Sequence, residues 1–284
     1  MRLQQFRAPV IGAFLLLVLT GCDQFTDPRP VQNSAIVEPK VTISVAAASD
    51  LKYVLEEIIT EFRQAHPEIA VKPTYGSSGS FYSQLLNKAP FDVFLSADVA
   101  YPQQLIDQGL AISESLIVYA MGRIVLWVRN DCPVDVEREG IASLRSASIK
   151  KIAIANPQHA PYGKAAEAAL YHFDIYEEVE DRIVFGENIA QAAQFVESGA
   201  ADIGIIAVSL TIADALREKG RQWPFPKDSY PPLEQGGVIM STTQERGACE
   251  AFLKFLGSDV CRDILKRYAF SYPGEMTLDG PVAP

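Results

Sequence analysis

The stretch VTISVAAASDLKYVLEEIITEFRQA, residues 41–65, decides the fold. Its first part is apolar and contains several β-branched residues, which predicts a strand over 41–46. Its second part has apolar residues at the three- and four-residue spacing of a helix, from Leu51 to Phe62, which predicts a helix over 50–65. A strand followed directly by an amphipathic helix is the unit from which helix-covered parallel sheets are built.

The same alternation continues towards the C-terminus. Strands are predicted over 69–75, 91–95, 151–155, 182–185, 203–206 and 238–240, and helices over 80–87, 99–107, 161–171, 189–197, 244–257 and 258–268. Adjacent strands over 116–119 and 123–129 interrupt the alternation. We therefore expect an α/β protein with two lobes, each a mostly parallel sheet flanked by helices, joined by a hinge of paired strands. The first lobe should contain residues 41–120 and 235–284, and the second residues 121–234.

The N-terminus has the features of an export signal. Basic residues precede an apolar run over 10–19, which is shorter than the ~20 residues of a spanning helix. The run ends in LTGC, residues 19–22, which resembles the lipobox of bacterial lipoproteins. We expect a signal peptide over 1–21, a diacylated Cys22 and a flexible Pro-rich stalk over 22–40, giving an exported, membrane-anchored protein that faces the periplasm or the cell exterior. An ordinary secretory signal and a buried core helix are the alternatives.

The composition of the chain limits the kinds of binding partner and the kinds of metal or redox site that we expect. The chain has 25 basic and 35 acidic residues, and the resulting net charge of −10 argues against nucleic acid. Once Cys22 is lipidated, Cys132, Cys249 and Cys261 remain, at spacings that exclude a CxxC metal or redox motif. A disulfide between Cys249 and Cys261 and three buried thiols are both compatible with the sequence. The three histidines are scattered, and none has the spacing of a metal site.

Four junctions between strands and helices carry the candidate site. They lie at 47–50, 76–80, 160–163 and 186–189, and they consist mainly of small or hydroxyl-bearing residues without Lys or Arg. Ligands of open α/β sheets bind at the carboxyl ends of the strands, and helix N-termini offer unpaired N–H groups to anions. Each junction alone is also explained as a helix cap or a turn. Together they predict a cleft that holds one small anion through hydroxyl and backbone N–H groups.

Several segments resemble a known family. AAASDL over 46–51, GSSGS over 76–80, APFDVFLSAD over 89–98, NPQHAPYG over 156–163 and RYAF over 267–270 resemble the substrate-binding component of the molybdate ABC transporter. The resemblance covers roughly residues 41–272. It implies a type II periplasmic-binding-protein fold and a monomer without cofactor or catalytic activity. The implied role is high-affinity binding of molybdate or tungstate outside the cytoplasm, for delivery to an ABC permease and its ATPase.

The resemblance also implies the site residues. Ser49 and Ser78 match the two serines that hydrogen-bond the oxyanion, with Ser77 as the nearest rival of Ser78. Backbone amides fall on Tyr162 and Ile189, so molybdenum would be held through its oxygens and not by direct metal ligands. The family's further donor is a tyrosine hydroxyl, and this chain has Ala207 at that position. A fifth donor is therefore left open, and the phenol of Tyr162 is one candidate for it.

The donor type predicts selectivity. Molybdate, tungstate and sulfate at neutral pH only accept hydrogen bonds, whereas hydrogen phosphate has a proton that needs an acceptor. A cleft of donors alone disfavours phosphate by about 1–3 kcal/mol. Asp50 would be an acceptor if it faced the cleft, but an acidic residue in the first turn of a helix usually stabilises that helix, and this is the role we expect for it.

Two other functions remain open on sequence grounds. A receptor of the same fold for sulfate, phosphate or another small solute would have the same strand and helix pattern. An exported α/β enzyme would need catalytic residues, and the chain has no GxSxG elbow, HExxH helix or Walker loop. We therefore expect a binding protein.

Overall fold

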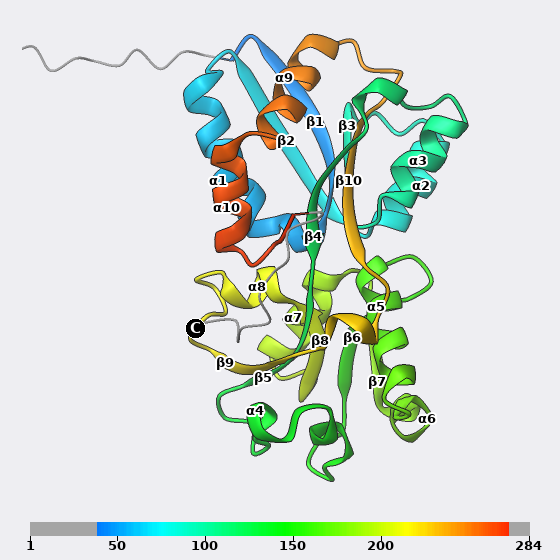
Figure 1. The fold of residues 1–284 in the computed structure, drawn as a ribbon, viewed down its shortest axis with the longest axis vertical. Helices are drawn as coiled ribbons and strands as arrows, with labels where there is room; N and C mark the ends of the chain where they lie inside the picture. Colours follow the sequence, from blue (N-terminus) through cyan, green and yellow to red (C-terminus); the bar gives the residue numbers. More distant parts are fainter. Residues whose placement is uncertain (1–38, 273–284) are drawn as a thin grey trace, which may run out of the picture. The chain divides into compact units, whose positions relative to one another are not determined.

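The protein is built on two five-stranded sheets. A computed structural model describes residues 39–272, so the predicted signal peptide, Cys22 and nearly all of the predicted stalk lie outside the described residues. Each sheet has its own helices, and we call a sheet with its helices a lobe (Figure 1). The described part is therefore a mixed α/β structure with two lobes, as the sequence predicted.

The first sheet has the strand order β2-β1-β3-β10-β4. Its strands are β1 (Val41–Ala48), β2 (Ile69–Gly76), β3 (Val93–Ser96), β4 (Ile117–Gly122) and β10 (Leu233–Ile239). β1 runs parallel to β2 and β3, whereas β10 runs antiparallel to β3 and β4. β1 has a neighbouring strand on each side, and this interior position explains its apolar sequence, because Ile43 and Val45 are fully buried.

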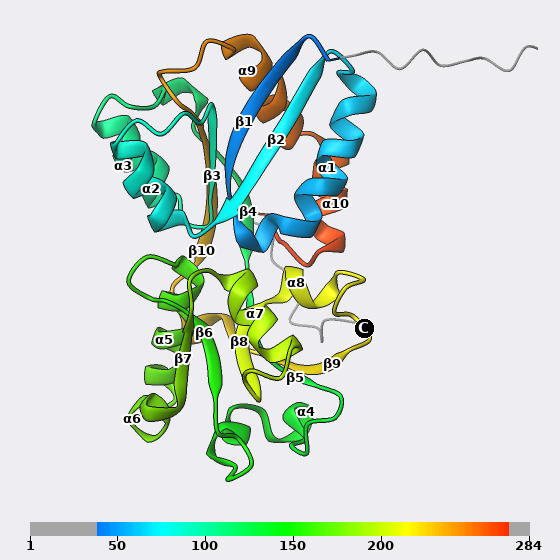
Figure 2. The same ribbon diagram turned by 180° about the vertical axis from the view of Figure 1, so that it is seen from behind.

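Helices cover both faces of the first sheet (Figures 1 and 2). A short 3₁₀ turn, Ser49–Leu51, leads from β1 into α1 (Lys52–Ala65), which packs with α9 (Arg246–Leu256) and α10 (Asp259–Arg267). α2 (Ser78–Leu86) and α3 (Ala100–Asp107) pack together on the opposite face. Separate apolar clusters lie on the two faces, one around Phe62 and Phe252 and the other around Phe81 and Phe94. The C-terminal helices thus belong to the first lobe.

The second sheet repeats this arrangement with the order β7-β6-β8-β5-β9. Its strands are β5 (Ile124–Arg129), β6 (Ile152–Ala155), β7 (Ile183–Gly186), β8 (Ile203–Ala207) and β9 (Gly220–Pro224). β6 is parallel to β7 and β8, and β5 is antiparallel to β8 and β9. The helices of this lobe are α4 (Val136–Glu139), α5 (Pro161–His172), α6 (Tyr176–Val179), α7 (Ile189–Glu197) and α8 (Val208–Ile212).

The connection between the lobes corrects one expectation. The two adjacent strands near the middle of the sequence do not pair with each other, because β4 belongs to the first sheet and β5 to the second. The chain passes directly from one sheet to the other around Arg123, and it returns between β9 and β10. β9 itself was not predicted, since its Gly220 and Pro224 weaken the pattern and it is an edge strand paired only with β5.

The three cysteines of the described residues do not pair with each other. Cys132, Cys249 and Cys261 are buried free thiols, so the alternative of a disulfide between Cys249 and Cys261 is not found. Burial raises the pKa of the Cys249 and Cys261 thiols to about 11.

Among the described residues, every helix is too short or too polar to cross a membrane.

Candidate anion-binding site

The carboxyl ends of β1, β2, β6 and β7 each lead into a helix start, and these starts converge between the lobes (Figure 1). They enclose a small pocket with a volume of about 10 Å³, close to the space that one water molecule fills. Its lining residues are Ala48, Ser49, Asp50, Ser77, Ser78, Ala97, Ala160, Pro161, Tyr162 and Ile189. The structure therefore brings together Ser49, Ser78, Tyr162 and Ile189, the four residues predicted to hold the ligand.

The start of α7 leaves one N–H group for a ligand. The first four N–H groups of a helix have no partner inside it. Here Ala190 N–H donates to Ser49 Oγ, and Gln191 N–H and Ala192 N–H donate to the side-chain and backbone oxygens of Asn188. Within residues 39–272 no acceptor is found for the remaining group, the N–H of Ile189. Ile189 is buried and lines the pocket.

The N–H groups at the start of α2 can be assigned to acceptors in the same way. Gly79 N–H donates to the backbone oxygen of His159, and Ser80 N–H and Phe81 N–H donate to the Oγ and backbone oxygen of Ser77. The first N–H, that of Ser78, has no acceptor among the described residues. Since Ser77 caps its own helix, the arrangement favours Ser78 over its rival as the serine that is available to a ligand.

At α5 the sequence itself removes one donor. Pro161 has no N–H, and the N–H groups of Gly163 and Lys164 both donate to the backbone oxygen of Ala160. The N–H of Tyr162 is left at the pocket wall. Gly163 is required here because a Cβ at this position would lie 2.2 Å from the backbone oxygen of Ala155, so the helix start could not approach β6 as closely.

Both serine hydroxyls are held with their protons available. Ser78 Oγ accepts a hydrogen bond of 2.9 Å from Ala97 N–H, and Ser49 Oγ accepts one of 3.3 Å from Ala190 N–H. A hydroxyl that accepts from a backbone amide still has its own O–H to donate. The pocket therefore offers three N–H groups and two hydroxyls as hydrogen-bond donors. This set suits a ligand that accepts hydrogen bonds, such as an anion.

Asp50 departs from the expectation that it stabilises its own helix. Its side chain is buried, and Oδ2 accepts hydrogen bonds from the phenol of Tyr162, at 3.0 Å, and from Nε2 of Gln235. Its other oxygen, Oδ1, is buried without a partner among the described residues. Burial raises the pKa of Asp50 to about 6, although the hydrogen bonds from Gln235 and Tyr162 oppose the shift.

This contact also excludes the phenol of Tyr162 as the candidate fifth donor. The hydroxyl donates its only proton to Asp50 and therefore does not replace the missing tyrosine at Ala207. Ala207 is buried at the end of β8, paired with Ile124, and is not part of the pocket wall. Tyr162 thus lines the pocket with its backbone N–H, while its side chain contacts Asp50.

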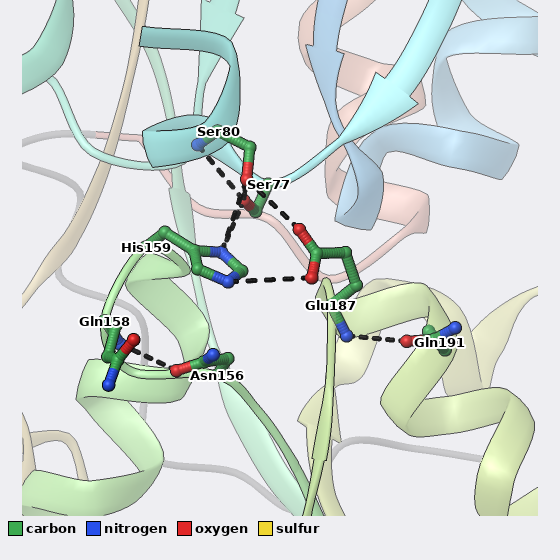
Figure 3. Close-up of polar contacts among 7 residues, drawn as sticks. All are labelled: Ser77, Ser80, Asn156, Gln158, His159, Glu187 and Gln191. Atoms are coloured by element: carbon green, nitrogen blue, oxygen red, sulfur yellow. Dashed lines mark hydrogen bonds and ion pairs between the residues drawn. The ribbon is translucent and has the colours of Figure 1, made fainter. Parts of the chain in front are cut away.

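A second group of polar contacts joins the lobes at the rim of the pocket (Figure 3). Ser77 Oγ lies 2.8 Å from His159 Nδ1, and His159 Nε2 lies 3.7 Å from a carboxylate oxygen of Glu187. Ser80 Oγ donates to the other oxygen of Glu187 over 3.3 Å. Ser77 and Ser80 belong to the first lobe and His159 and Glu187 to the second, so these contacts bridge the two lobes beside the pocket.

A larger cleft of about 520 Å³ adjoins the pocket and shares Ser49 with it. Its wall is formed mainly by α1 and α7 and includes Lys52, Tyr53, Tyr75 and Glu197. It contains only one of the four predicted residues, whereas the small pocket contains all of them. The unused donors therefore place the candidate site in the small pocket despite its size.

Comparison with known proteins identifies the family. The family of bacterial extracellular solute-binding proteins matches residues 43–271. The chain belongs to this family. Among curated relatives of this solute-binding protein, the molybdate-binding protein ModA of Rhodobacter capsulatus is 36% identical over 196 residues, which is 69% of this chain and 75% of that protein. ModA of Azotobacter vinelandii is 34% identical over 230 residues, covering 80% and 89%.

The fold comparison agrees with the sequence comparison. The solved periplasmic molybdate-binding protein of Azotobacter vinelandii superposes on this solute-binding protein with a TM-score of 0.76 at 32% identity. The superposition covers 81% of this chain and 99% of that one. The expected periplasmic-binding-protein fold is thereby confirmed.

Three residues of the site were missed or misjudged in the sequence of this solute-binding protein. Gln235 lies in β10 beside two glycines, and the only signal for it was a polar side chain within a buried strand. The spacing around His159 excluded a metal site but indicated no other role for this residue. Asp50 was assigned to its own helix, because its partners lie 112 and 185 residues away along the chain.

Proposed function

We propose that this protein binds molybdate or tungstate outside the cytoplasm and delivers it to an ABC transporter. The observation that carries the proposal is the set of five unused donors around one pocket, namely the N–H groups of Ser78, Tyr162 and Ile189 and the hydroxyls of Ser49 and Ser78. The curated relatives named as molybdate-binding proteins support the choice of anion.

The donors are sufficient for tight binding without a cation. A hydrogen bond to a charged group contributes about 1.5–3 kcal/mol, so five contribute roughly 8–15 kcal/mol. Each helix N-terminus adds about 0.3–1 kcal/mol, and up to about 2 when it is partly buried. Binding near 10 nM corresponds to roughly 11 kcal/mol, after the costs of association have been met. Strong binding by this pocket is therefore physically reasonable.

Binding requires the lobes to move, because a pocket of about 10 Å³ is too small for a tetrahedral oxyanion. We propose that the two lobes, 41–120 with 235–284 and 121–234, rotate about the two crossings between the sheets. The anion would replace the contact between Ser49 Oγ and Ala190 N–H that now spans the lobes. The contacts of His159 with Ser77 and Glu187 would then close over it.

The anchor proposed at Cys22 fits this role. A receptor tethered to the membrane meets its transporter at a raised local concentration, and a diacylated cysteine anchors stably. The proposed partners are the ABC permease and its ATPase, with the protein acting as a monomer. Mass spectrometry of the membrane fraction should find the mature N-terminus at a diacylated Cys22. An unmodified N-terminus at another residue would contradict the anchor.

A panel of anions tests the function directly. In thermal unfolding of the purified mature protein, molybdate and tungstate should raise Tm more than sulfate does, because a ligand stabilises the state that binds it. The anion should be recovered unchanged, since the proposal is binding without catalysis. A response to sulfate, phosphate or an organic acid, with none to molybdate or tungstate, would assign the protein to another ligand of the same fold.

The two serines provide the mutational test. Ser49→Ala and Ser78→Ala should each weaken molybdate binding by about 1–3 kcal/mol, because each removes a hydroxyl donor from the pocket wall. Titration calorimetry measures the change. Ser198→Ala, at an exposed serine, is the matched control. Unchanged affinity in both site variants would show that the anion binds elsewhere.

A further inference from the structure

Asp50 places an unpaired carboxylate oxygen at an anion-binding pocket. Asp50 lines the same small pocket as Ser49, Ser78 and Tyr162, and its side chain is buried. Oδ1 has no hydrogen-bond partner among the described residues. An ionised carboxylate and a bound dianion would repel each other strongly in this environment, where little water screens them.

The hydrogen bonds around Asp50 determine which of its oxygens can hold a proton. The phenol of Tyr119 donates to Oε1 of Gln235 over 3.0 Å, so the amide of Gln235 turns its Nε2 towards Asp50. Gln235 and Tyr162 both donate to Oδ2. Oδ2 is thereby fixed as an acceptor, which leaves Oδ1 as the oxygen for a proton.

We propose that Asp50 is a specificity-determining residue that holds a proton on Oδ1, shared with the bound anion. The proposal rests on the proposed function of oxyanion binding. With molybdate, which has no proton at neutral pH, the proton comes from solvent, and one proton is taken up for each anion bound. The neutral carboxyl then donates its O–H to a ligand oxygen as a further hydrogen bond.

Within residues 39–272, no Lys, Arg or His is among the groups that set the pKa of Asp50. The titratable groups in contact with its hydrogen-bond network are the phenols of Tyr162 on α5 and Tyr119 on β4. Burial and the nearby Asp50 raise the pKa of both phenols well above the usual value, so they stay neutral. Of the elements packed against the Ser49–Leu51 turn, α8 has no titratable residue. The nearest such residues of α1, β2 and α7 line the larger cleft: Lys52, Tyr53, Tyr75 and Glu197.

Burial therefore sets the protonation of the empty site. It raises the pKa of Asp50 to about 6, and the negative charge of a bound dianion raises it further. Below about pH 6 the pocket already contains the proton and is a set of donors only. Above it, ionised Asp50 supplies an acceptor that suits the proton of hydrogen phosphate. Raising the pH should thus weaken molybdate binding and reduce the discrimination against phosphate.

Calorimetric titration of the mature protein with molybdate at several pH values tests the proposal. Between about pH 6.5 and 8.5, the Kd should rise about tenfold for each pH unit. Titrations in buffers with different ionisation enthalpies should show uptake of about one proton per anion. Hydrogen phosphate, if it binds at all, should bind with little proton uptake because it brings its own proton.

Asp50→Asn mimics the protonated carboxyl, since its amide offers one acceptor and one donor in the same shape. Its affinity for molybdate should not depend on pH over the same range, and above about pH 7 it should exceed that of the wild type. Asp263→Asn, at an exposed aspartate of α10, is the matched control and should keep the wild-type dependence.

The outcomes separate this proposal from the proposed function. Molybdate binding by the wild type with a constant Kd and no proton uptake would overturn the role of Asp50 and leave the function standing. The same pH dependence in Asp50→Asn as in the wild type would assign the proton to another group and would also overturn it. No binding of any oxyanion at any pH would overturn the function itself. The proton count of the wild type decides the matter even if the variant fails to fold.

Discussion

Replacing Gly79 by alanine is expected to weaken oxyanion binding about 5- to 150-fold, the equivalent of about 1–3 kcal/mol for an overpacked contact. Gly79 belongs to α2 of the first lobe, and its N–H donates to the backbone oxygen of His159 in the second lobe over 2.8 Å. A Cβ on Gly79 would lie 2.5 Å from that oxygen and 2.9 Å from the Cα of His159. Backbone atoms cannot turn aside, so the lobes would have to stay further apart.

The effect should fall on affinity more than on folding. Gly79 lies inside a helix with an ordinary backbone conformation, where alanine is favoured by about 0.5–1 kcal/mol. The third close atom, the hydroxyl of Tyr101, is the end of a side chain that can move. Gly247→Ala in α9 is the matched control, because a Cβ there meets nothing within 4 Å. Wild-type affinity in Gly79→Ala would mean that the lobes need not approach this closely to hold the ligand.

Replacing Asp50 by asparagine is expected to raise the free energy of unfolding of the ligand-free protein by up to about 3 kcal/mol at neutral pH. The pKa of Asp50 is about 6 in the folded protein, against 3.8 for an unperturbed aspartate. The folded state therefore favours the neutral carboxyl. That preference stabilises the wild type fully below about pH 3.8, and the stabilisation is lost as the pH rises to about 6. Asparagine cannot ionise, so it avoids this loss.

The pH dependence is the decisive part of that measurement. In chemical denaturation, the difference between Asp50→Asn and the wild type should be largest above about pH 6 and should shrink towards about pH 4. Asp263→Asn should show no such difference, since that aspartate is exposed. A change of the same size at every pH would contradict the burial of an ionisable Asp50, because it would reflect packing or hydrogen bonding alone.

The sequence was sufficient to predict the helix starts that form the pocket. Pro161 at the first helical position and Asn188 as a cap are local signals, and the structure begins α5 and α7 at Pro161 and Ile189 as expected. α2 begins two residues before the predicted start at Ser80, because Ser77 caps it. That shift makes Ser78 the first residue of the helix and leaves its N–H available to a ligand.

The contacts of Asp50 with distant segments of the chain could not be predicted in this way. Tyr162 and Gln235 reach Asp50 from α5 and β10, and no local pattern joins segments so far apart in the chain. The 3₁₀ turn Ser49–Leu51 also places Asp50 before α1, whose first residue is Lys52. A side chain in this turn can point across to the other lobe, whereas the predicted helix start at Asp50 suggested a purely local role.

The absence of lysine and arginine from the ten residues that line the pocket has a kinetic consequence. A chain with a net charge of −10 repels an approaching dianion at long range, and no basic side chain in the pocket wall offsets this field before the anion arrives. Added salt screens that repulsion, so association should become faster as ionic strength rises. The buried N–H and hydroxyl contacts act only at short range, so dissociation should respond little. The association rate of this receptor should therefore be highest at high ionic strength. A site that attracts its anion through arginine should show the opposite dependence.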